Sequence, residues 1–156
     1  MRLSEIEVLL QSLVGERVEA KTIVGNSISL WFSVEPKHPS AKRIWVDPPW
    51  RLDMADGPES SSYDFPWEKR EGESDAEYRL RFETACASSD CLRGNTLSAA
   101  IVDHSTSDLT LEFADGRRLR AFPIDLDEEN WHFADHAQRK RYGVLVKGVE
   151  IAEIDA

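Results

Sequence analysis

The chain has 156 residues, of which 41% are hydrophobic and 31% are charged, and its formal net charge is −10. This balance excludes a disordered chain and is typical of one globular domain, which we expect to span residues 1–156. The negative field repels nucleic acid and anionic membranes, so we expect neither as a partner. It would attract a basic protein and weaken that association as salt is added, although the same charge also serves solubility alone.

Location and cofactors are inferred from what the sequence lacks. The N-terminus has no apolar run of signal-peptide length, and no segment reaches the ~20 apolar residues of a membrane-spanning helix. Cys86 and Cys91 are too few for a disulfide framework in a chain of this size. We therefore expect a cytoplasmic protein, and no motif indicates a bound cofactor.

A short helix is predicted at the N-terminus. Ser4 and Glu7 have the spacing of a capping box, and Gly15 is a typical residue at a helix end. The apolar residues of this segment recur on one helical face: Ile6, Leu9, Leu10 and Leu13.

The rest of the chain reads as two diverged copies of a strand–turn–strand unit. Residues 13–32 align with residues 92–113, so that Gly15 falls on Gly94. In both stretches apolar residues alternate along the second strand, which places them on one face. Chance similarity between two amphipathic β segments is the alternative.

The repeat defines the predicted fold, which is mainly β (α+β): a short N-terminal helix and two antiparallel β-meander repeats in one sheet-based domain. Asp115 and Gly116 supply the tight turn of a hairpin in the second copy. The first copy has a longer loop there, over 33–42, with two prolines. The predicted parts are repeat one at about 13–52, an acidic insert at about 53–90, and repeat two at about 91–154.

The insert between the copies is strongly acidic. From Asp53 to Glu83 it has ten acids and four bases, a net charge of −6. Gly57, Pro58 and a run of serines favour a loop at its start. The aromatic residues that follow would be wasted in solvent, so we expect them to fold back onto the domain: Tyr63, Phe65 and Trp67.

The end of the insert admits two interpretations. Tyr78, Leu80 and Phe82 alternate with charged residues, which favours a strand. Ser74 and Glu77 keep a helix open, because they have capping-box spacing.

The C-terminal part is also ambiguous. Charges over 127–142 suit a helix, with acids at its start and bases at its end. Trp131 and Phe133 alternate around His132, and strand-forming residues follow, so we favour a hairpin.

Residues 107–133, SDLTLEFADGRRLRAFPIDLDEENWHF, resemble small bacterial β-repeat proteins in their order of strand, Asp-Gly turn, strand and final Glu-x-Trp. Several such families are uncharacterised, and some resemble the immunity proteins encoded beside polymorphic toxins. The resemblance implies a protein that covers the active site of a toxin. It assigns no functional residue.

Two histidines raise the possibility of a metal site. On a helix, His132 and His136 would share a face, as zinc ligands do, with Glu128 or Glu129 serving from outside the pair. Cys86 and Cys91 would complete a four-ligand site, although their spacing is loose for zinc. Solvent-facing histidines and small buried cysteines explain the same residues, so we expect no metal ligand. A small metal-dependent enzyme or ligand-binding protein remains an alternative function.

Other features weigh against catalysis. No G-x-S-x-G, P-loop or G-x-G-x-x-G motif is present, and we expect Asp103-His104-Ser105 to form a polar turn. Trp31 and Trp45 point away from the predicted core face, and we favour a covered second face over an exposed aromatic patch.

The sequence favours a non-catalytic protein-binding module, of the kind that neutralises a basic toxin by charge and shape. We expect no catalytic residue, although an enzyme is not excluded. A structural subunit that pairs through its sheet edges is a third reading. The predicted partner-binding residues are Asp64, Trp67, Glu68, Glu71, Asp125, Asp127, Glu128, Glu129 and Trp131.

Overall fold

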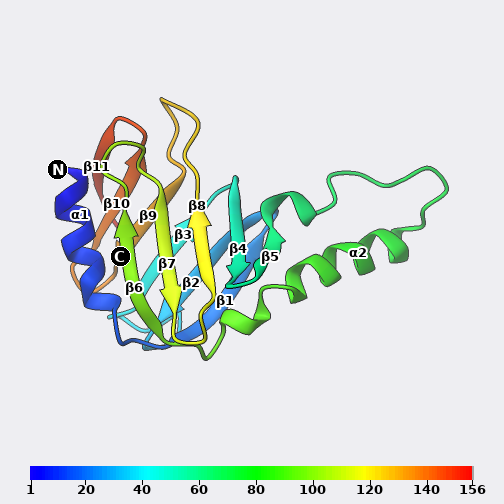
Figure 1. The fold of residues 1–156 in the computed structure, drawn as a ribbon, viewed down its shortest axis with the longest axis horizontal. Helices are drawn as coiled ribbons and strands as arrows, with labels where there is room; N and C mark the ends of the chain where they lie inside the picture. Colours follow the sequence, from blue (N-terminus) through cyan, green and yellow to red (C-terminus); the bar gives the residue numbers. More distant parts are fainter. Residues whose placement is uncertain (156) are drawn as a thin grey trace.

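Two antiparallel sheets face each other in the computed structural model, which describes residues 1–155 (Figure 1). The six-stranded sheet has the order β1 (Val18–Val24), β2 (Ser27–Phe32), β3 (Lys42–Val46), β9 (Trp131–Asp135), β10 (Lys140–Leu145) and β11 (Gly148–Glu153). The five-stranded sheet has the order β5 (Gly57–Ser61), β4 (Trp50–Met54), β8 (Arg118–Ala121), β7 (Leu109–Phe113) and β6 (Leu97–Val102). The helical segments are α1 (Leu3–Leu10), η1 (Gln11–Leu13), η2 (Ser62–Asp64), α2 (Asp75–Ala87) and η3 (Asp90–Leu92).

The core lies between the sheets. Side chains alternate along each strand, and the apolar ones point toward the other sheet. Along β7 the buried residues are Leu109, Leu111 and Phe113, with half-buried residues between them. Trp50 and Trp131, the first residues of β4 and β9, are the largest fully buried side chains. The predicted mainly β fold with a short N-terminal helix is confirmed.

The strands are exchanged between the two predicted repeats. β1, β2 and β3 lie in the six-stranded sheet, but the next two strands, β4 and β5, cross over to the five-stranded sheet, where β4 pairs with β8 of the predicted second repeat and with β5 at the edge. In the same way, β6, β7 and β8 lie in the five-stranded sheet, whereas β9 crosses back and pairs with β3. Each repeat therefore contributes strands to both sheets.

Contacts at aligned positions are reciprocal. Gly15 N donates to Leu97 O at 2.8 Å, and Gly94 N donates to Val18 O at 2.8 Å. β1 and β6 each have a bulge after their first residue. A duplication remains a prediction, which these contacts support.

The two buried indoles repeat the pattern. Trp50 Nε1 donates to Asn26 O at 2.7 Å, in the turn between β1 and β2, and Trp131 Nε1 donates to Ser107 O at 2.9 Å, in the loop between β6 and β7. Each indole therefore ties the start of a crossing strand to a turn contributed by the same predicted repeat.

The N-terminal helix begins differently from the prediction. Its N-cap is Arg2, whose backbone N–H donates to Glu5, and not Ser4 paired with Glu7. Glu7 instead accepts the backbone N–H of Val102 at 2.6 Å, so its carboxylate ties α1 to the edge strand β6.

Residues 62–89, here called the arm, extend from the sandwich beside β5 (Figure 1). The predicted strand at Tyr78 to Phe82 is wrong, because this segment is helix α2, capped by Ser74 and Glu77 as in the alternative. The loop expected at Gly57 and Pro58 is also wrong. These residues begin β5, and a proline is tolerated there because β5 is an edge strand.

The aromatic residues at the base of the arm behave differently from one another. Phe65 is buried as expected and packs edge-to-face against Trp50 and Phe82. Tyr63 and Trp67 are 69% and 72% exposed, so the prediction that they fold back is wrong.

The predicted hairpins of the second repeat are confirmed. Asp115 and Gly116 lie in the turn between β7 and β8, and β9 and β10 form the hairpin favoured over a helix at 127–142. The loop over 33–41 separates β2 from β3. Within residues 1–155, no helix is both long and apolar enough to cross a membrane.

Candidate functional site

A groove with a volume of about 330 Å³ lies between the β8–β9 loop, the β1–β2 turn and the segment after β3. We call it the acidic groove. It is lined by Asn26, Ser27, Asp47, Pro48, Ile124, Asp125, Glu128, Glu129 and Asn130. Four of these residues are carboxylates, and no lysine or arginine of the described chain is among them. The lining is therefore a concentrated region of negative potential.

Two carboxylates of the groove are fixed by the protein through one oxygen. Asp47 Oδ1 accepts hydrogen bonds from Ser27 Oγ at 2.5 Å and Trp45 Nε1 at 2.8 Å. Asp125 Oδ1 accepts the backbone N–H groups of Asp127 at 2.8 Å and Glu128 at 3.2 Å, which shapes the β8–β9 loop. Their positions are set by the fold, because these bonds orient each carboxylate before any partner arrives.

Glu129 connects the acidic groove to the outer face of the six-stranded sheet. Its Oε1 lies 2.6 Å from His132 Nδ1 and accepts a hydrogen bond from Arg141 at 2.5 Å. Gly143 makes room for this arrangement: a Cβ there would lie 2.3 Å from Glu129 Oε2. A larger residue at this register position would force the end of the Glu129 side chain to move away from its present partners.

The protonation of His132 follows from its neighbours. A guanidinium nitrogen of Arg43 lies 3.1 Å from His132 Nε2, and a guanidinium can only donate. His132 Nε2 is therefore the acceptor. A guanidinium nitrogen of Arg141 also lies 3.1 Å from Nδ1, but Glu129 Oε1 is closer to Nδ1, at 2.6 Å, and an ionised carboxylate can only accept. We therefore place the ring proton on Nδ1, where it is donated to Glu129. We assign His132 as neutral in this tautomer.

The pKa values of this pair agree with that assignment. Burial lowers the pKa of His132 below its usual 6.5, and the charges of Arg141 and Arg43 add to the effect, against the opposing influence of Glu129. Burial alone would raise the pKa of Glu129, but hydrogen bonds from His132 and Arg141 and the positive charge of Arg141 outweigh it and lower that pKa.

The outer face of the same sheet carries a cation–π stack. The guanidinium carbon of Arg43 lies 5.0 Å from the Trp31 ring centroid and 5.5 Å from that of Trp45. Both indoles are half-buried, and Trp45 also stacks against His132 at 6.1 Å. This face is packed, so the alternative of an exposed aromatic patch is not realised at these two residues.

A second groove, of about 240 Å³, lies at the base of the arm beside the β1–β2 turn. Its lining residues are Gly25, Asn26, Phe65, Pro66, Trp67, Tyr78 and Phe82. Tyr78 connects α2 to the segment before it, because its hydroxyl donates a hydrogen bond to Pro66 O at 3.2 Å. Asn26 lines this groove and the acidic groove, so the exposed indole of Trp67 and the four carboxylates lie on either side of one turn.

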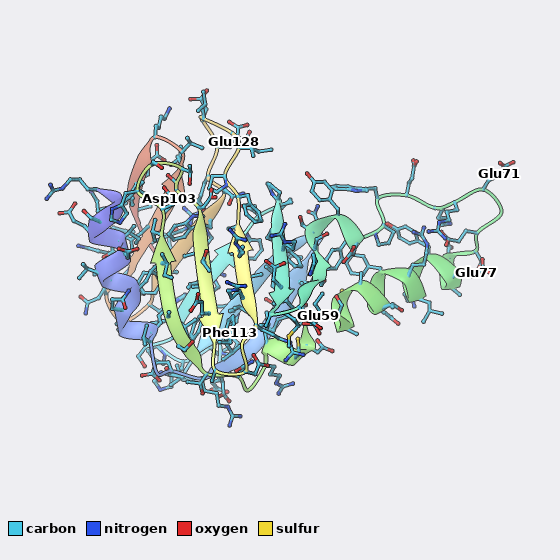
Figure 2. The ribbon with its side chains drawn as sticks, viewed as in Figure 1. Glu59, Glu71, Glu77, Asp103, Phe113 and Glu128 are labelled. Atoms are coloured by element: carbon cyan, nitrogen blue, oxygen red, sulfur yellow. The ribbon has the colours of Figure 1, made fainter. Side chains whose placement is uncertain are left out.

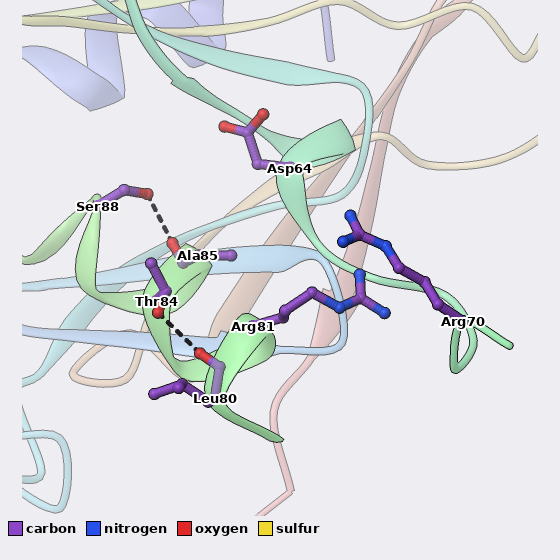
Figure 3. Close-up of a pocket in the computed structure, with 7 residues that line it drawn as sticks. All are labelled: Asp64, Arg70, Leu80, Arg81, Thr84, Ala85 and Ser88. Carbon is purple, nitrogen blue, oxygen red and sulfur yellow. Dashed lines mark hydrogen bonds between the residues drawn. The ribbon is translucent and has the colours of Figure 1, made fainter. Parts of the chain in front are cut away.

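A third groove, of about 470 Å³, lies between η2 and α2 (Figure 3). Arg70 and Arg81 lie at one end of its lining, away from Ser88, and Leu80 is 64% exposed. Arg81 is engaged by Glu73 at 2.6 Å, and this hydrogen bond is the main cause that lowers the pKa of Glu73 to about 2. The third groove thus has mixed charge, unlike the acidic groove.

The predicted contact residues fall into two separate groups (Figure 2). One group is exposed on the arm: Asp64, Trp67, Glu68 and Glu71. The other is exposed on the β8–β9 loop: Asp125, Asp127 and Glu128. Asp127 lies outside the lining of the acidic groove and pairs with Lys147 at 2.8 Å.

Two of the predicted residues have other roles. Trp131 is fully buried, so its prediction as a surface anchor is wrong; on β9 it alternates inward together with Phe133. Glu129 is half-buried and occupied by His132 and Arg141, although it still lines the acidic groove.

The hypothetical zinc site is not assembled. His132 on β9 and His136 in the turn after it both contact indoles of the outer face, Trp45 and Trp31, but their polar partners differ. His132 is held by Glu129 and Arg43, whereas His136 Nδ1 lies 2.9 Å from Ala41 O. Cys86 and Cys91 are half-buried free thiols whose pKa values are raised by burial. Residues 1–155 contain no group of three or more histidine, cysteine or acidic side chains arranged for a metal.

Sequence reasoning missed Asn26, Asp47 and Asn130 as parts of a site, because they come from three segments far apart in the chain. The proline pair after Asp47 could have pointed to this part of the site. It marks the position where the chain leaves β3 and crosses to the other sheet.

No protein family, curated protein or solved structure matches the chain in comparisons with known proteins. A function is therefore inferred from the residues of the grooves and the arm.

Proposed function

We propose that this protein is a non-catalytic module that binds a basic protein through the acidic groove and the adjacent face of the arm. The acidic groove carries the proposal, because it combines four carboxylates with no base among its lining residues. Trp67 supplies an exposed aromatic side chain across the β1–β2 turn, and indoles are favoured anchors at protein interfaces. The net charge of −10 favours rapid association with a cationic partner.

The partner class that best fits this surface is a basic nuclease toxin, with the protein acting as its immunity protein in the bacterial cytoplasm. Support comes from the charge and from the resemblance of residues 107–133 to β-repeat proteins of that kind. Such a protein needs no catalytic residue, only a surface that covers the toxin's phosphate-binding site.

The test uses the purified protein encoded by the neighbouring gene as the partner. Isothermal titration calorimetry at two salt concentrations measures the dissociation constant of the complex. Wild-type protein should bind the partner, more weakly at higher salt. The double substitution Asp125→Lys with Glu128→Lys should weaken binding about 100-fold or more. The two new positive charges would then repel the basic partner.

The matched control is Glu150→Lys with Glu153→Lys, which changes the net charge equally on exposed positions of β11. It should weaken binding about tenfold at most, through the long-range field alone. Equal losses in the two double variants, or binding that ignores salt, would contradict the proposed surface.

A further inference from the structure

The edge of β6 is closed by α1, which lies along it in the place of a further strand (Figure 1). The Glu7 carboxylate accepts the backbone N–H of Val102 at 2.6 Å, and the side-chain amide of Gln11 donates to the backbone oxygen of Ala100 at 3.1 Å. The two side chains are four residues apart, on one side of the helical segment. They therefore hold a backbone donor and a backbone acceptor that an uncovered edge strand would leave unpaired.

β6 differs from the other edge strands of the described chain in its residues. Its sequence, LSAAIV, contains neither a charged residue nor a proline. Charged residues and prolines on an edge strand hinder its pairing with a strand of another molecule. The other three edge strands carry such residues: Glu19 and Lys21 on β1, Pro58 and Glu59 on β5, and Glu150 and Glu153 on β11. The helix thus covers the edge whose own residues protect it least.

We infer that the β6 edge is an interaction surface for a second copy of this chain, and that α1 keeps this surface closed. When α1 moves away, β6 of one copy pairs antiparallel with β6 of the other about a twofold axis at Ile101. Ala100 of each copy then lies opposite Val102 of the other, and the two residues exchange both backbone hydrogen bonds. The groups that α1 holds, Val102 N–H and Ala100 O, become partners of one another across the interface.

The side chains of β6 suit this pairing. Ile101 is 48% exposed, and the twofold axis places it beside its counterpart, so apolar surface is buried at the centre of the contact. No charged side chain of β6 meets a like charge. The paired stretch is limited to residues 99–102, because the backbone of Leu97 stays bonded to Gly15 and Glu16. A pairing this short is weak, so we expect a dimer that forms only at high protein concentration.

The closed arrangement is the stable one in the wild-type chain. Ile6 and Leu10 of α1 are fully buried, so moving the helix away exposes two core side chains. We therefore expect the wild-type protein to be monomeric. Self-association should appear when the polar contacts between α1 and β6 are removed.

The test variant is Glu7→Ala with Gln11→Ala in the full-length chain, which leaves the apolar face of α1 intact. At low concentration, hydrogen exchange of the Val102 amide should speed up about tenfold or more, because its acceptor is lost. As the concentration rises, light scattering should show a dimer, and the protection of the Val102 amide should return. The matched control is Ser4→Ala with Val8→Ala, at exposed positions of the same helix, and it should stay monomeric.

A charge on β6 identifies the interface. Adding Ile101→Lys to the test variant should abolish the dimer, because two like charges would then face one another at the twofold axis. Adding Val24→Lys instead places the same charge on an exposed position of edge strand β1 and should leave the dimer intact. Association caused by misfolding would not depend on Ile101 in this way.

A test variant that stays monomeric at high concentration would overturn the inference. So would association that survives Ile101→Lys, because the contact would then lie elsewhere, or association that is lost with Val24→Lys. A wild-type protein that dimerises as strongly as the test variant would show that α1 does not close the edge, and the inference would fail.

Discussion

The missing side chain of Gly143 leaves the space in which the Glu129 carboxylate forms its polar contacts. Gly143 pairs with His132 across β9 and β10, and the carboxylate of Glu129 lies over it. This position allows Glu129 to contact Arg141 and His132 at once. The network lies at the back of the acidic groove, so its integrity also sets the position of one of the four groove carboxylates.

Gly143→Ala should lower the free energy of unfolding by about 2 kcal/mol, because the new Cβ displaces Glu129 from a half-buried network. Urea denaturation measures the loss. In a Glu129→Ala background the same substitution should cost about 0.5 kcal/mol or less, since the clash is gone. A similar cost in both backgrounds would show that the glycine is needed for another reason.

Acidification should destabilise the protein through His132. Its pKa in the folded protein lies below 6.5, so the unfolded chain takes up a proton that the folded state does not. The free energy of unfolding should therefore fall as pH drops below about 6.5, and the lowered pKa of Glu129 extends the loss below 4.5.

Urea midpoints between pH 8 and pH 5 test this effect, with His132→Gln as the comparison. The variant should be less stable at pH 8 but flatter across this range. A long-range ¹H–¹⁵N spectrum at pH 7 should show His132 protonated on Nδ1; protonation on Nε2 instead would contradict the assigned network.

Trp67 and Trp131 should differ sharply although both were predicted as surface anchors. Trp67→Ala should change the free energy of unfolding by about 0.5 kcal/mol or less, because the side chain is 72% exposed. Trp131→Ala should cost about 3–5 kcal/mol, since it empties a fully buried site and removes the bond to Ser107 O. Denaturation of both variants by urea, followed by circular dichroism, compares them directly.

At the scale of elements, the arm shows why alternation is a weak signal in short polar segments. Tyr78 and Phe82 line the groove at its base and lie four residues apart, which suits a helix, while Leu80 points elsewhere and is 64% exposed. The same three residues also fit a strand, and the capping pair at Ser74 and Glu77 is what distinguishes the two.

Turns were the most predictable features of the sequence, and long-range contacts the least. The Asp-Gly turn located β7 and β8 because its chemistry is local. Asp125 and Glu128 were named from the sequence as contact residues, which stays a prediction, and both line the acidic groove; Trp67 was expected to fold back and is exposed instead. The acidic groove and the Glu129 network were not predicted, because they join segments such as Asp47 and Asn130 that only the strand crossover brings together.

Ser74→Ala should loosen α2 without unfolding the sandwich. Loss of the cap costs about 1 kcal/mol, so amide hydrogen exchange should speed up about fivefold in the first turns of α2 and stay unchanged in β2. Thr84→Ala is the control on the same helix and should slow exchange there, because alanine is the better helix former. Faster exchange throughout both sheets after Ser74→Ala would show that the arm is part of the core unit.

At the scale of the whole molecule, strand exchange should make the two halves inseparable. β3 pairs with β9 and β4 pairs with β8, so both sheets depend on strands from before and after the arm. Cleavage at a protease site inserted at Gly72, an exposed position before α2, should leave both fragments in one folded species.

Gel filtration and thermal denaturation test the nicked protein. It should elute as one peak and unfold in one cooperative transition at a slightly lower temperature, because a covalent link is lost while all strand pairs remain. Separation of the fragments in native buffer would contradict the idea that the exchanged strands hold the sandwich together.

The exchange also dictates an order of events during synthesis. β4 leaves the ribosome long before β8, and β3 long before β9, so neither sheet can be completed until the second half of the chain has emerged. Meanwhile β3 and β4 have unpaired edges that invite association with other chains. The stretch from Asp53 to Glu83, with its net charge of −6, lies between the two halves of the nascent chain. While the first half is incomplete, this charge repels other chains and opposes their association with the unpaired edges.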